Sequence, residues 1–600
     1  MKKIILCASL LSIAIAHAQE NEKTIDEVHI QGKFIQTPYK NVAENIEVIT
    51  AREIALTPAR SIDEVLQQIP GLDIRRRGPN GVQSDVTLRG SSFEQVMILV
   101  NGIRMNDSQT GHNSMNIPVD LANVERIEII KGPAAVRFGN NAYAGVINII
   151  TKPEAEENVK IFAEGGDFST HKLGMNATFG SGRLSNLFQI TRGGSEGYRH
   201  NTDYAVSNVF YQNKFSLKNG SVGLQAGFSE KKFGANGFYA SAAATEQYEE
   251  AQASVVALKH EQSIGNFAFN SNVYWRRGQD MYLFNRQKPE IYRNMHIGNN
   301  IGGEVNGTYR SPLGTTGLGV ELKKEFLASN NLGHRERFIT QLFFMHHISL
   351  MNDRLQITPG ISWADFSEQG NFFYPGLDVG FHFNEYHKLY GNIAKVHRIP
   401  TFTDLYYLSK TEKGNAALQP EHALSAEVGY RFAATKSIFK ISGFMRNTDN
   451  AIDWVKIPQN TLWNAMNVGE IETKGLEAEA EQRVSDWLKL FAGYTYLDSS
   501  YKNTGNSSSK YVAEHLRHQV IGRAQFSFLK YFSNELAYRY QERFTTGSYH
   551  LLDEKLSFRR NQLGIDLTIN NLTNTKYTEA FGVPMPGRWF SLGVSYGIGL

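Results

Sequence analysis

An alternation of apolar and polar residues, which continues from about residue 158 to residue 600, constrains the fold of this chain most strongly. In one such segment, Leu563, Ile565, Leu567 and Ile569 alternate with Gly564, Asp566 and Thr568. Successive side chains of a β-strand point to opposite faces, so a period of two predicts strands with one apolar and one polar face. Gly, Asn, Asp and Ser separate the segments, as expected for turns. The pattern therefore predicts a mainly β protein.

A soluble propeller or β-helix also alternates, so the period alone leaves that reading open. Three features favour a transmembrane β-barrel: the missing helical interruption, the charged and amide residues on the polar face, and Tyr and Phe near strand ends. The segments also lack the fixed repeat of propellers and solenoids. At roughly 20 residues per strand and connection, the region gives about 22 antiparallel strands. Such a barrel has a lumen wide enough to need a plug.

The first 18 residues have the features of a secretory signal peptide. Lys2 and Lys3 precede an apolar run from Ile4 to Ala16, and Ala16-His17-Ala18 offers small residues for cleavage. The run is shorter than the roughly 20 residues that span a bilayer. The only cysteine, Cys7, lies inside this segment. We therefore expect a mature chain without disulfides or thiolate metal sites.

Composition and motifs exclude several classes of function. The 62 Lys and Arg residues nearly balance the 59 Asp and Glu residues, and no basic block suggests nucleic acid. The mean hydropathy of −0.36 fits either a soluble protein or a barrel. The serine-hydrolase elbow, the H-E-x-x-H helix, the P-loop and the dinucleotide fingerprint are all missing. We expect neither an enzyme nor a bound cofactor or metal.

Residues 40–153 resemble a compact α+β domain, which precedes a barrel over residues 154–600. Val42 to Ile49 predicts a strand, and Ser61 with Glu64 predicts a capping box at a helix start. Asn101-Gly102 predicts a type I′ hairpin turn. The domain ends with a strand before Pro153, and a domain of this size is the obvious plug.

Several motifs of this chain are similar to those of TonB-dependent outer-membrane receptors, in the family's order. They are Thr87-Leu-Arg-Gly90, Val100-Asn-Gly102, Val124-Glu-Arg-Ile-Glu-Ile-Ile-Lys-Gly-Pro133, Phe138-Gly139, Gly145-Val-Ile-Asn-Ile-Ile150, Asn570-Asn-Leu-Thr-Asn574, Lys576-Tyr577 and Pro586-Gly-Arg588. The resemblance implies a plug domain inside the barrel lumen, and a multi-pass barrel in the outer membrane of a Gram-negative bacterium. It also implies energised import of a metal-chelate nutrient, with outer-membrane lipids and the barrel assembly machinery as further partners.

The segment of residues 19–39 lies where the family has its TonB box, before the plug. The resemblance implies that TonB, with its inner-membrane energising complex, binds Ile25, Asp26, Glu27, Val28, His29 and Ile30. An edge strand added to the TonB sheet would be held mainly by main-chain hydrogen bonds. A linker of coincidental composition is the alternative for this segment, and a passive porin-like barrel is the alternative for the protein.

The resemblance also implies an ion-pair cluster between plug and barrel, which we name the lock. Its expected members are Arg89 and Lys131 on the plug, with Glu427 and Glu477 on the barrel wall. Lys131 stands where some family members have arginine, and this change forfeits bidentate geometry. The alternative is four solvated lumen charges of little energetic weight.

Two plug loops are expected to form the floor of a ligand site. The candidate ligand-binding residues are Ser92, Phe93, Asn106, Asp107, His112 and Asn113. The second loop and the barrel segment from Arg398 to Tyr407 resemble the cobalamin-receptor branch, which implies cobalamin or a related corrinoid as ligand. A ferric siderophore or haem receptor remains the alternative, with His112 as a conceivable ligand of haem iron.

Overall fold

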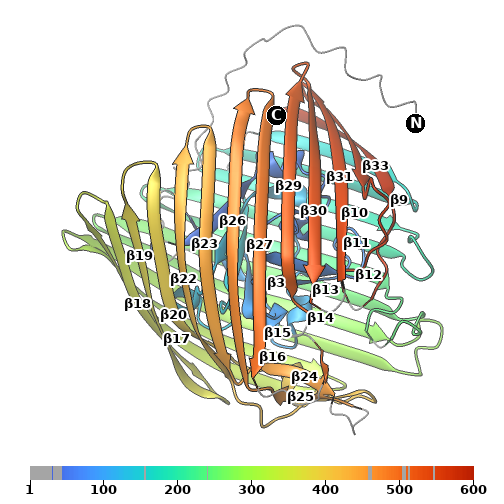
Figure 1. The fold of residues 1–600 in the computed structure, drawn as a ribbon, viewed down its shortest axis with the longest axis horizontal. Coiled ribbons are helices and arrows are strands. Elements are labelled where there is room, and N and C mark those ends of the chain that lie inside the picture. Colours follow the sequence, from blue (N-terminus) through green and yellow to red (C-terminus); the bar gives the residue numbers. More distant parts are fainter. Residues whose placement is uncertain are drawn as a thin grey trace.

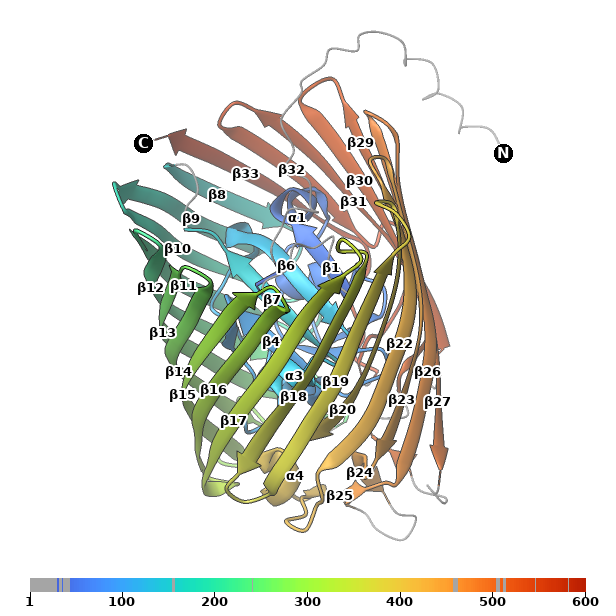
Figure 2. The same cartoon turned by 90° about the vertical axis from the view of Figure 1, so that its left-hand side faces the viewer.

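The computed structural model describes residues 30–31, 35, 44–153, 157–239, 241–456, 462–502, 508–510, 514–544, 547–580 and 582–599. These residues form a closed barrel of 22 antiparallel strands around a smaller N-terminal domain (Figure 1, Figure 2). The predicted fold class and strand number are confirmed. The proposed signal peptide, residues 1–18, lies outside the described residues.

The barrel strands follow chain order around the cylinder, and the last strand closes against the first. Ser591 pairs with Gly166, and Gly599 pairs with Asn158. The strands are β8 (Asn158–Gly166), β9 (Thr170–Ser181), β10 (Leu184–Ser195), β11 (Tyr204–Leu217), β12 (Gly220–Gly234), β13 (Tyr248–Ile264), β14 (Phe267–Leu283), β15 (Arg293–Ser311), β16 (Gly314–Ser329), β17 (Gly333–Leu350), β18 (Leu355–Phe366), β19 (Gly370–His382), β20 (His387–Arg398), β22 (Glu421–Ala434), β23 (Ser437–Asp449), β26 (Glu470–Ser485), β27 (Leu488–Lys502), β29 (Leu516–Phe528), β30 (Phe532–Arg543), β31 (Gly547–Arg560), β32 (Leu563–Asn570) and β33 (Trp589–Gly599).

The alternation in the sequence separates an apolar outer face from a polar lumen. On β14, the side chain of Val273 is 62% exposed, whereas its neighbour Tyr274 faces inward and is 4% exposed. Leu173 and Leu258 are likewise exposed on the outside. The closed barrel satisfies the backbone hydrogen bonds of its strands. The apolar outer band then allows the barrel to lie in lipid.

The domain inside the lumen, the plug, is built on a five-stranded mixed sheet ordered β1-β6-β7-β4-β5 and a separate hairpin of β2 and β3. Its strands are β1 (Asn45–Thr50), β2 (Leu72–Arg76), β3 (Ser84–Leu88), β4 (Val96–Val100), β5 (Ile103–Arg104), β6 (Val124–Lys131) and β7 (Gly145–Thr151). Its helices are α1 (Ala51–Leu56), α2 (Ile62–Leu66) and α3 (Ala135–Phe138), with 3₁₀ turns η3 (Phe93–Gln95), η4 (Gly111–Asn113) and η5 (Leu121–Asn123). None of the helices in the described ranges is long and apolar enough to cross a membrane.

Two local predictions for the plug have different outcomes. Asn101 and Gly102 both have positive φ, 51° and 80°, as the predicted type I′ turn requires. The predicted capping box at Ser61 is wrong, because the Glu64 carboxylate accepts from the backbone N–H of Arg60 and from the Arg76 guanidinium. A capping box instead joins Thr50 and Glu53, at the start of α1.

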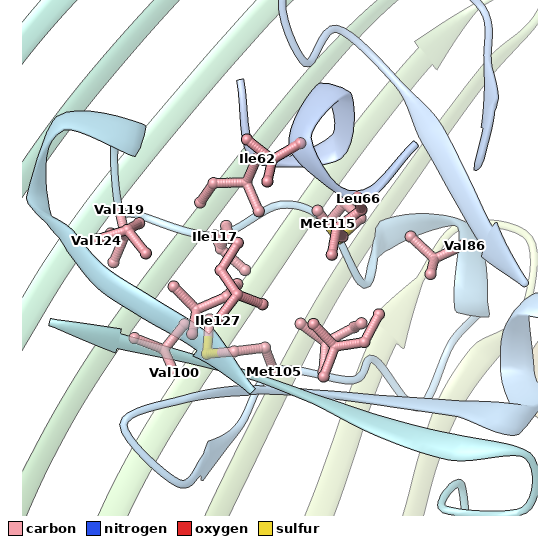
Figure 3. Close-up of a cluster of buried hydrophobic side chains, with 14 of the residues drawn as sticks. Ile62, Leu66, Val86, Val100, Met105, Met115, Ile117, Val119, Val124 and Ile127 are labelled. Carbon is pink, nitrogen blue, oxygen red and sulfur yellow. The ribbon is translucent and has the colours of Figure 1, made fainter. Parts of the chain in front are cut away.

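The hydrophobic core of the plug continues into the barrel wall. Figure 3 shows its centre, where Leu66, Val100, Met105 and Ile127 lie together with other aliphatic side chains. The same buried cluster includes barrel residues from β10, β11, β13 and β14, namely Leu187, Phe210, Val255, Ala257 and Tyr274. Part of the apolar surface of the plug is therefore buried only because the barrel surrounds it.

A small four-stranded sheet lies at the barrel end opposite the C-terminal end of β33 (Figure 1). It consists of β21 (Glu412–Lys413), β24 (Ile452–Lys456), β25 (Trp463–Asn467) and β28 (Ser508–Ser509). Helix α4 (Phe402–Tyr406) connects this region to the plug, since the backbone N–H groups of Phe402 and Thr403 donate to the carbonyls of Ser108 and Gln109. The plug loop around residue 108 therefore faces the end that carries the small sheet.

Candidate functional site

The candidate ligand floor consists of plug residues 91–94 and 105–113, which meet where η3 contacts η4. Phe93 and His112 stack with ring centroids 4.1 Å apart and an interplanar angle of 29°. Nδ1 of His112 lies 2.6 Å from a carboxylate oxygen of Asp85. Two predicted residues from separate loops thus form one stacked pair, which we call the platform. Its Phe93 ring is buried, and its His112 ring is held by a carboxylate that the sequence did not indicate.

Asp85 is itself held by Arg77, whose Nη1 lies 2.8 Å from its second oxygen. Burial alone would raise the pKa of Asp85, but the Arg77 guanidinium and the His112 ring hold that pKa well below its usual range. The ionised carboxylate orients the His112 ring, so the platform keeps one orientation.

Asn106, Asp107 and Asn113 make protein contacts that were not anticipated. The Asn106 amide accepts from the N–H of Ile98 at 2.9 Å and donates to the carbonyl of Val96 at 2.9 Å. Asp107 pairs with barrel residue Arg276 at 2.9 Å. These contacts brace the loop rather than leaving polar groups directed at a ligand.

The remaining two predicted floor residues have similar local contacts. Asn113 is buried, and its side-chain oxygen accepts from Asn116 at 3.2 Å. Ser92 lies at the start of η3, where its backbone N–H donates to Gln95 at 3.0 Å. His112 and Phe93 are therefore the floor residues whose arrangement most resembles a binding surface.

Glu94 is a floor residue that the prediction omitted. Burial raises the pKa of its carboxyl to about 8, against an opposing effect of Arg398 and a reinforcing effect of Asp404. Arg398 also pairs with Glu421 at 2.6 Å. Glu94 lay in a loop expected to form the floor, but only the fold brings the barrel segment from Arg398 to Asp404 against it.

Arg89 joins the two barrel glutamates predicted for the lock. Its guanidinium makes hydrogen bonds of 2.9 and 3.0 Å to Glu427 and of 3.0 and 2.9 Å to Glu477. Phe444 lies beneath, with its ring centroid 4.2 Å from the guanidinium carbon. Burial would lower the pKa of Arg89, but the two carboxylates raise it well above its ordinary value. These four hydrogen bonds form a fully buried charge cluster.

Lys131 lies in the same cluster but has a partner that the prediction lacked. Its ammonium is 2.7 Å from Glu479 and 3.3 Å from Glu477. Lys440 connects Glu479 at 3.4 Å to Glu47 of the plug at 2.6 Å. Glu479 follows Glu477 by two residues, so the alternation of the strand places both on the lumen face, and this signal could have identified it.

A second set of ion pairs, absent from the prediction, holds the plug to another part of the wall. Arg76 lies 2.9 Å from Glu579 and 2.9 Å from Glu64. Arg543 of β30 makes two bonds to Asp73, of 2.6 and 2.5 Å. The run of three arginines at positions 75–77 is the sequence signal that could have pointed to this contact.

The proposed TonB-binding segment lies largely outside the described residues. Of its six members only Ile30 is described, and its side chain is fully buried beside Ile46, Val48 and Ile130 of the plug. The next residue, Gln31, donates its N–H to Glu128 at 3.2 Å. In the part of the chain that the structure describes, no three His, Cys, Asp or Glu side chains gather as metal ligands.

Family models match both parts of the chain. The model described as TonB dependent receptor-like, beta-barrel matches residues 159–572. The TonB-dependent Receptor Plug Domain matches residues 38–146. The barrel match alone covers more than half of the chain. The two matched ranges correspond to the barrel and the plug of the structure.

Two relatives are similar to this chain over most of their length. The vitamin B12 transporter BtuB of Vibrio vulnificus is 25% identical over 647 residues, covering 99% of this chain and 98% of that protein. The vitamin B12 transporter BtuB of Photobacterium profundum is 25% identical over 525 residues, covering 84% of each chain.

Solved structures share the fold at lower identity. The ferric enterobactin receptor PfeA of Pseudomonas aeruginosa has a TM-score of 0.78 at 17% identity, covering 93% of this chain and 99% of that one. The siderophore receptor PirA of Acinetobacter baumannii has a TM-score of 0.76 at 17% identity, with 92% and 98% covered. The barrel, the enclosed plug and the family matches agree, and the chain belongs to the TonB-dependent receptors, transport proteins of the Gram-negative outer membrane.

Proposed function

We propose that this receptor imports cobalamin or a related corrinoid. The observation that carries the proposal is the match to vitamin B12 transporters along almost the whole chain, at 25% identity over 99% of its residues. The family membership itself implies ligand transport and interaction with TonB. The siderophore receptors of similar structure support the fold and leave the ligand to be tested.

The charge of the floor agrees with a neutral ligand. Arg77 is paired with Asp85, Arg276 with Asp107 and Arg398 with Glu421. Cations that are neutralised in this way attract an anionic ferric siderophore less strongly than exposed guanidinium groups would. A corrinoid presents amide arms and an apolar macrocycle edge, which suit the Phe93–His112 platform.

We propose Ser92, Phe93, Asn106, Asp107, His112 and Asn113 as the residues of the ligand floor, with two different tasks. His112 and Phe93 would contact the ligand. The other four would hold their loops in place through the contacts described above. The proposed site therefore depends on ligand contact at two residues and on loop positioning at four.

We propose that TonB binds residues 25–30 and that the lock releases the plug when this segment is pulled. Ile30 is buried against the plug, so strand addition that includes Ile30 requires its side chain to leave that contact. The buried ion pairs of Arg89 and Lys131 oppose displacement of the plug until then.

Two measurements test this function. Binding of cyanocobalamin, haem and ferric enterobactin to purified receptor should show a preference for cyanocobalamin. Haem or ferric enterobactin as the preferred ligand would overturn the corrinoid assignment. Deletion of residues 24–30 should abolish uptake while surface binding is kept, and unchanged uptake would instead indicate a passive barrel.

A further inference from the structure

A cavity of about 100 Å³ lies between the plug and the barrel wall formed by β9–β12. Asn80, Met115 and Val119 line it from the plug, and Tyr204 and Val206 line it from the barrel. This volume holds a few water molecules, so passage of a larger ligand requires the plug to move away from this wall. Another cavity, between α3 and the wall of β18–β20, has about 40 Å³.

Two buried polar side chains in the first cavity have unsatisfied atoms. Oδ2 of Asp63 and Oδ1 of Asn208 have no hydrogen-bond partner among the described residues, although these side chains are only 2% and 8% exposed. Both residues line the cavity. A buried acceptor without a donor is costly, so this site favours an occupant that donates hydrogen bonds. Met115, Ile117 and Val119 offer the same occupant an apolar surface.

The plug is attached to this part of the wall differently from elsewhere. Buried ion pairs tie it to β14, β16, β22, β26 and β30. Among ion pairs between described residues, none joins the plug to β10, β11 or β12. Leu187 and Phe210 extend the plug core there. Hydrogen bonds also cross to the plug: the Lys231 ammonium donates to the carbonyl of Gly81 at 2.7 Å, and Gln189 accepts from the N–H of Asp120 at 3.2 Å. Apolar contacts and single hydrogen bonds cost less to break than buried ion pairs do.

Two ion pairs at the edge of the cavity are partly open to solvent. Lys172 of β9 pairs with Asp120 at 2.6 Å, with 23% of the lysine side chain exposed. Arg60 pairs with Glu164, whose side chain is 20% exposed. Ion pairs with access to water are weaker than buried ones, so these two form the least costly boundary to open.

We propose that the ligand passes the plug along the wall of β9–β12, through this cavity. The occupant that suits its lining, once the plug moves, is an uncharged amphipathic chelate with hydrogen-bond donors, such as primary amide arms. The donors meet Asp63 and Asn208, and the apolar parts meet Met115 and Ile117. This inference rests on the proposed import of a corrinoid. The experiments below distinguish a wrong ligand from a wrong route of passage.

The first experiment fills each cavity with a phenyl group. Val206→Phe narrows the proposed passage, and Ala394→Phe fills the control cavity on β20, which Ala394 lines. Surface binding and energised uptake of radiolabelled cyanocobalamin are measured in cells that lack their own receptor. Val206→Phe should lower uptake by about tenfold with binding within about twofold, equivalent to an activation barrier about 1.4 kcal/mol higher. Ala394→Phe should import like the wild type. Equal loss in both variants, or wild-type uptake by a folded Val206→Phe, overturns the proposed side of passage.

A second experiment needs no known ligand. Cys7 is the only cysteine in the sequence and lies in the proposed signal peptide, so Val206→Cys and Ala394→Cys each introduce a thiol suited to selective labelling. Maleimide labelling is followed in energised cells and in cells treated with an uncoupler. Labelling of Val206→Cys should accelerate on energisation, and that of Ala394→Cys should not. Wild-type cells that fail to import cyanocobalamin would count against the corrinoid, whereas equal acceleration at both positions would count against the passage.

Discussion

Asn45, the first residue of β1, donates its side-chain amide to Glu427 at 3.0 Å and so shares that carboxylate with Arg89. Glu47, two residues later, pairs with Lys440, which also contacts Glu479. β1 is the first described strand after the segment proposed to bind TonB. A pull on that segment therefore acts first on Asn45 and Glu47, which contact Glu427 and Lys440 of the ion-pair cluster. It acts on Arg89 and Lys131 only afterwards.

The relationship predicts that Asn45→Leu weakens the lock without breaking it. The variant removes one donor from Glu427 and keeps both Arg89 bonds, so the loss should be about 1–3 kcal/mol. Sensitivity of cells to large antibiotics should rise slightly, by less than in Arg89→Ala. Leakage equal to that of Arg89→Ala would contradict this ordering.

Arg89→Ala should loosen the plug strongly. It leaves Glu427 and Glu477 buried without their main cation, and breaking a buried ion pair in this way costs about 3–5 kcal/mol. Permeation of large antibiotics and conductance of the purified receptor in planar bilayers measure the effect. Arg89→Lys serves as the control, since it keeps the charge and loses the forked geometry. Wild-type permeability in Arg89→Ala would exclude the lock.

Lys131 and Glu479 should be energetically coupled. Lys131→Met alone removes the cation that lies 2.7 Å from Glu479, whereas Lys131→Met combined with Glu479→Gln removes both charges. Because an unpaired buried charge costs more than a missing pair, the double variant should be less destabilised than the sum of the single variants. Thermal unfolding in detergent measures all four proteins, and additive effects would show that the pair contributes nothing.

The Glu94 carboxyl should make the plug less stable as pH rises. Its pKa of about 8 in the folded protein exceeds the value of roughly 4.3 in an unfolded chain, so the folded state binds the proton more tightly. The associated stability is present below the unfolded value and is lost as pH rises towards 8. Glu94→Gln should reduce the decrease in melting temperature between pH 5 and pH 8, and Glu125→Gln is the control. An undiminished decrease in Glu94→Gln would refute this assignment.

His112→Ala should weaken ligand binding while the fold is kept. The substitution removes the ring that stacks on Phe93 and leaves Asp85 paired with Arg77. Affinity for cyanocobalamin should fall about tenfold, or 1.4 kcal/mol. His200→Ala is a matched control, because the His200 side chain is 66% exposed in a loop. Unchanged affinity in His112→Ala would remove this residue from the proposed floor.

Local patterns were sufficient for some of these features and misleading for others. The Asn101-Gly102 turn depends on two neighbouring residues, and the structure has the predicted conformation. The capping box at Ser61 failed because Arg76, from the next strand, takes the Glu64 carboxylate. Asn106 was predicted to face a ligand, but its amide bonds to the backbone of β4, and no local pattern reveals that contact.

The alternation and its length determined that this chain forms about 22 strands with one apolar and one polar face, because each strand needs roughly 10 residues and its two faces are set by neighbouring residues. The charged polar face, the aromatic strand ends and the missing repeat favoured a membrane barrel among such folds. The tertiary structure decided which lumen residues meet. Glu479 was identifiable as facing inward, but its pairing with Lys131 depends on how the plug is turned within the barrel. The same is true of Asp73 with Arg543, which lie 470 residues apart in the chain. Such contacts are set by the packing of one domain against another, and a two-residue period contains no information about that packing.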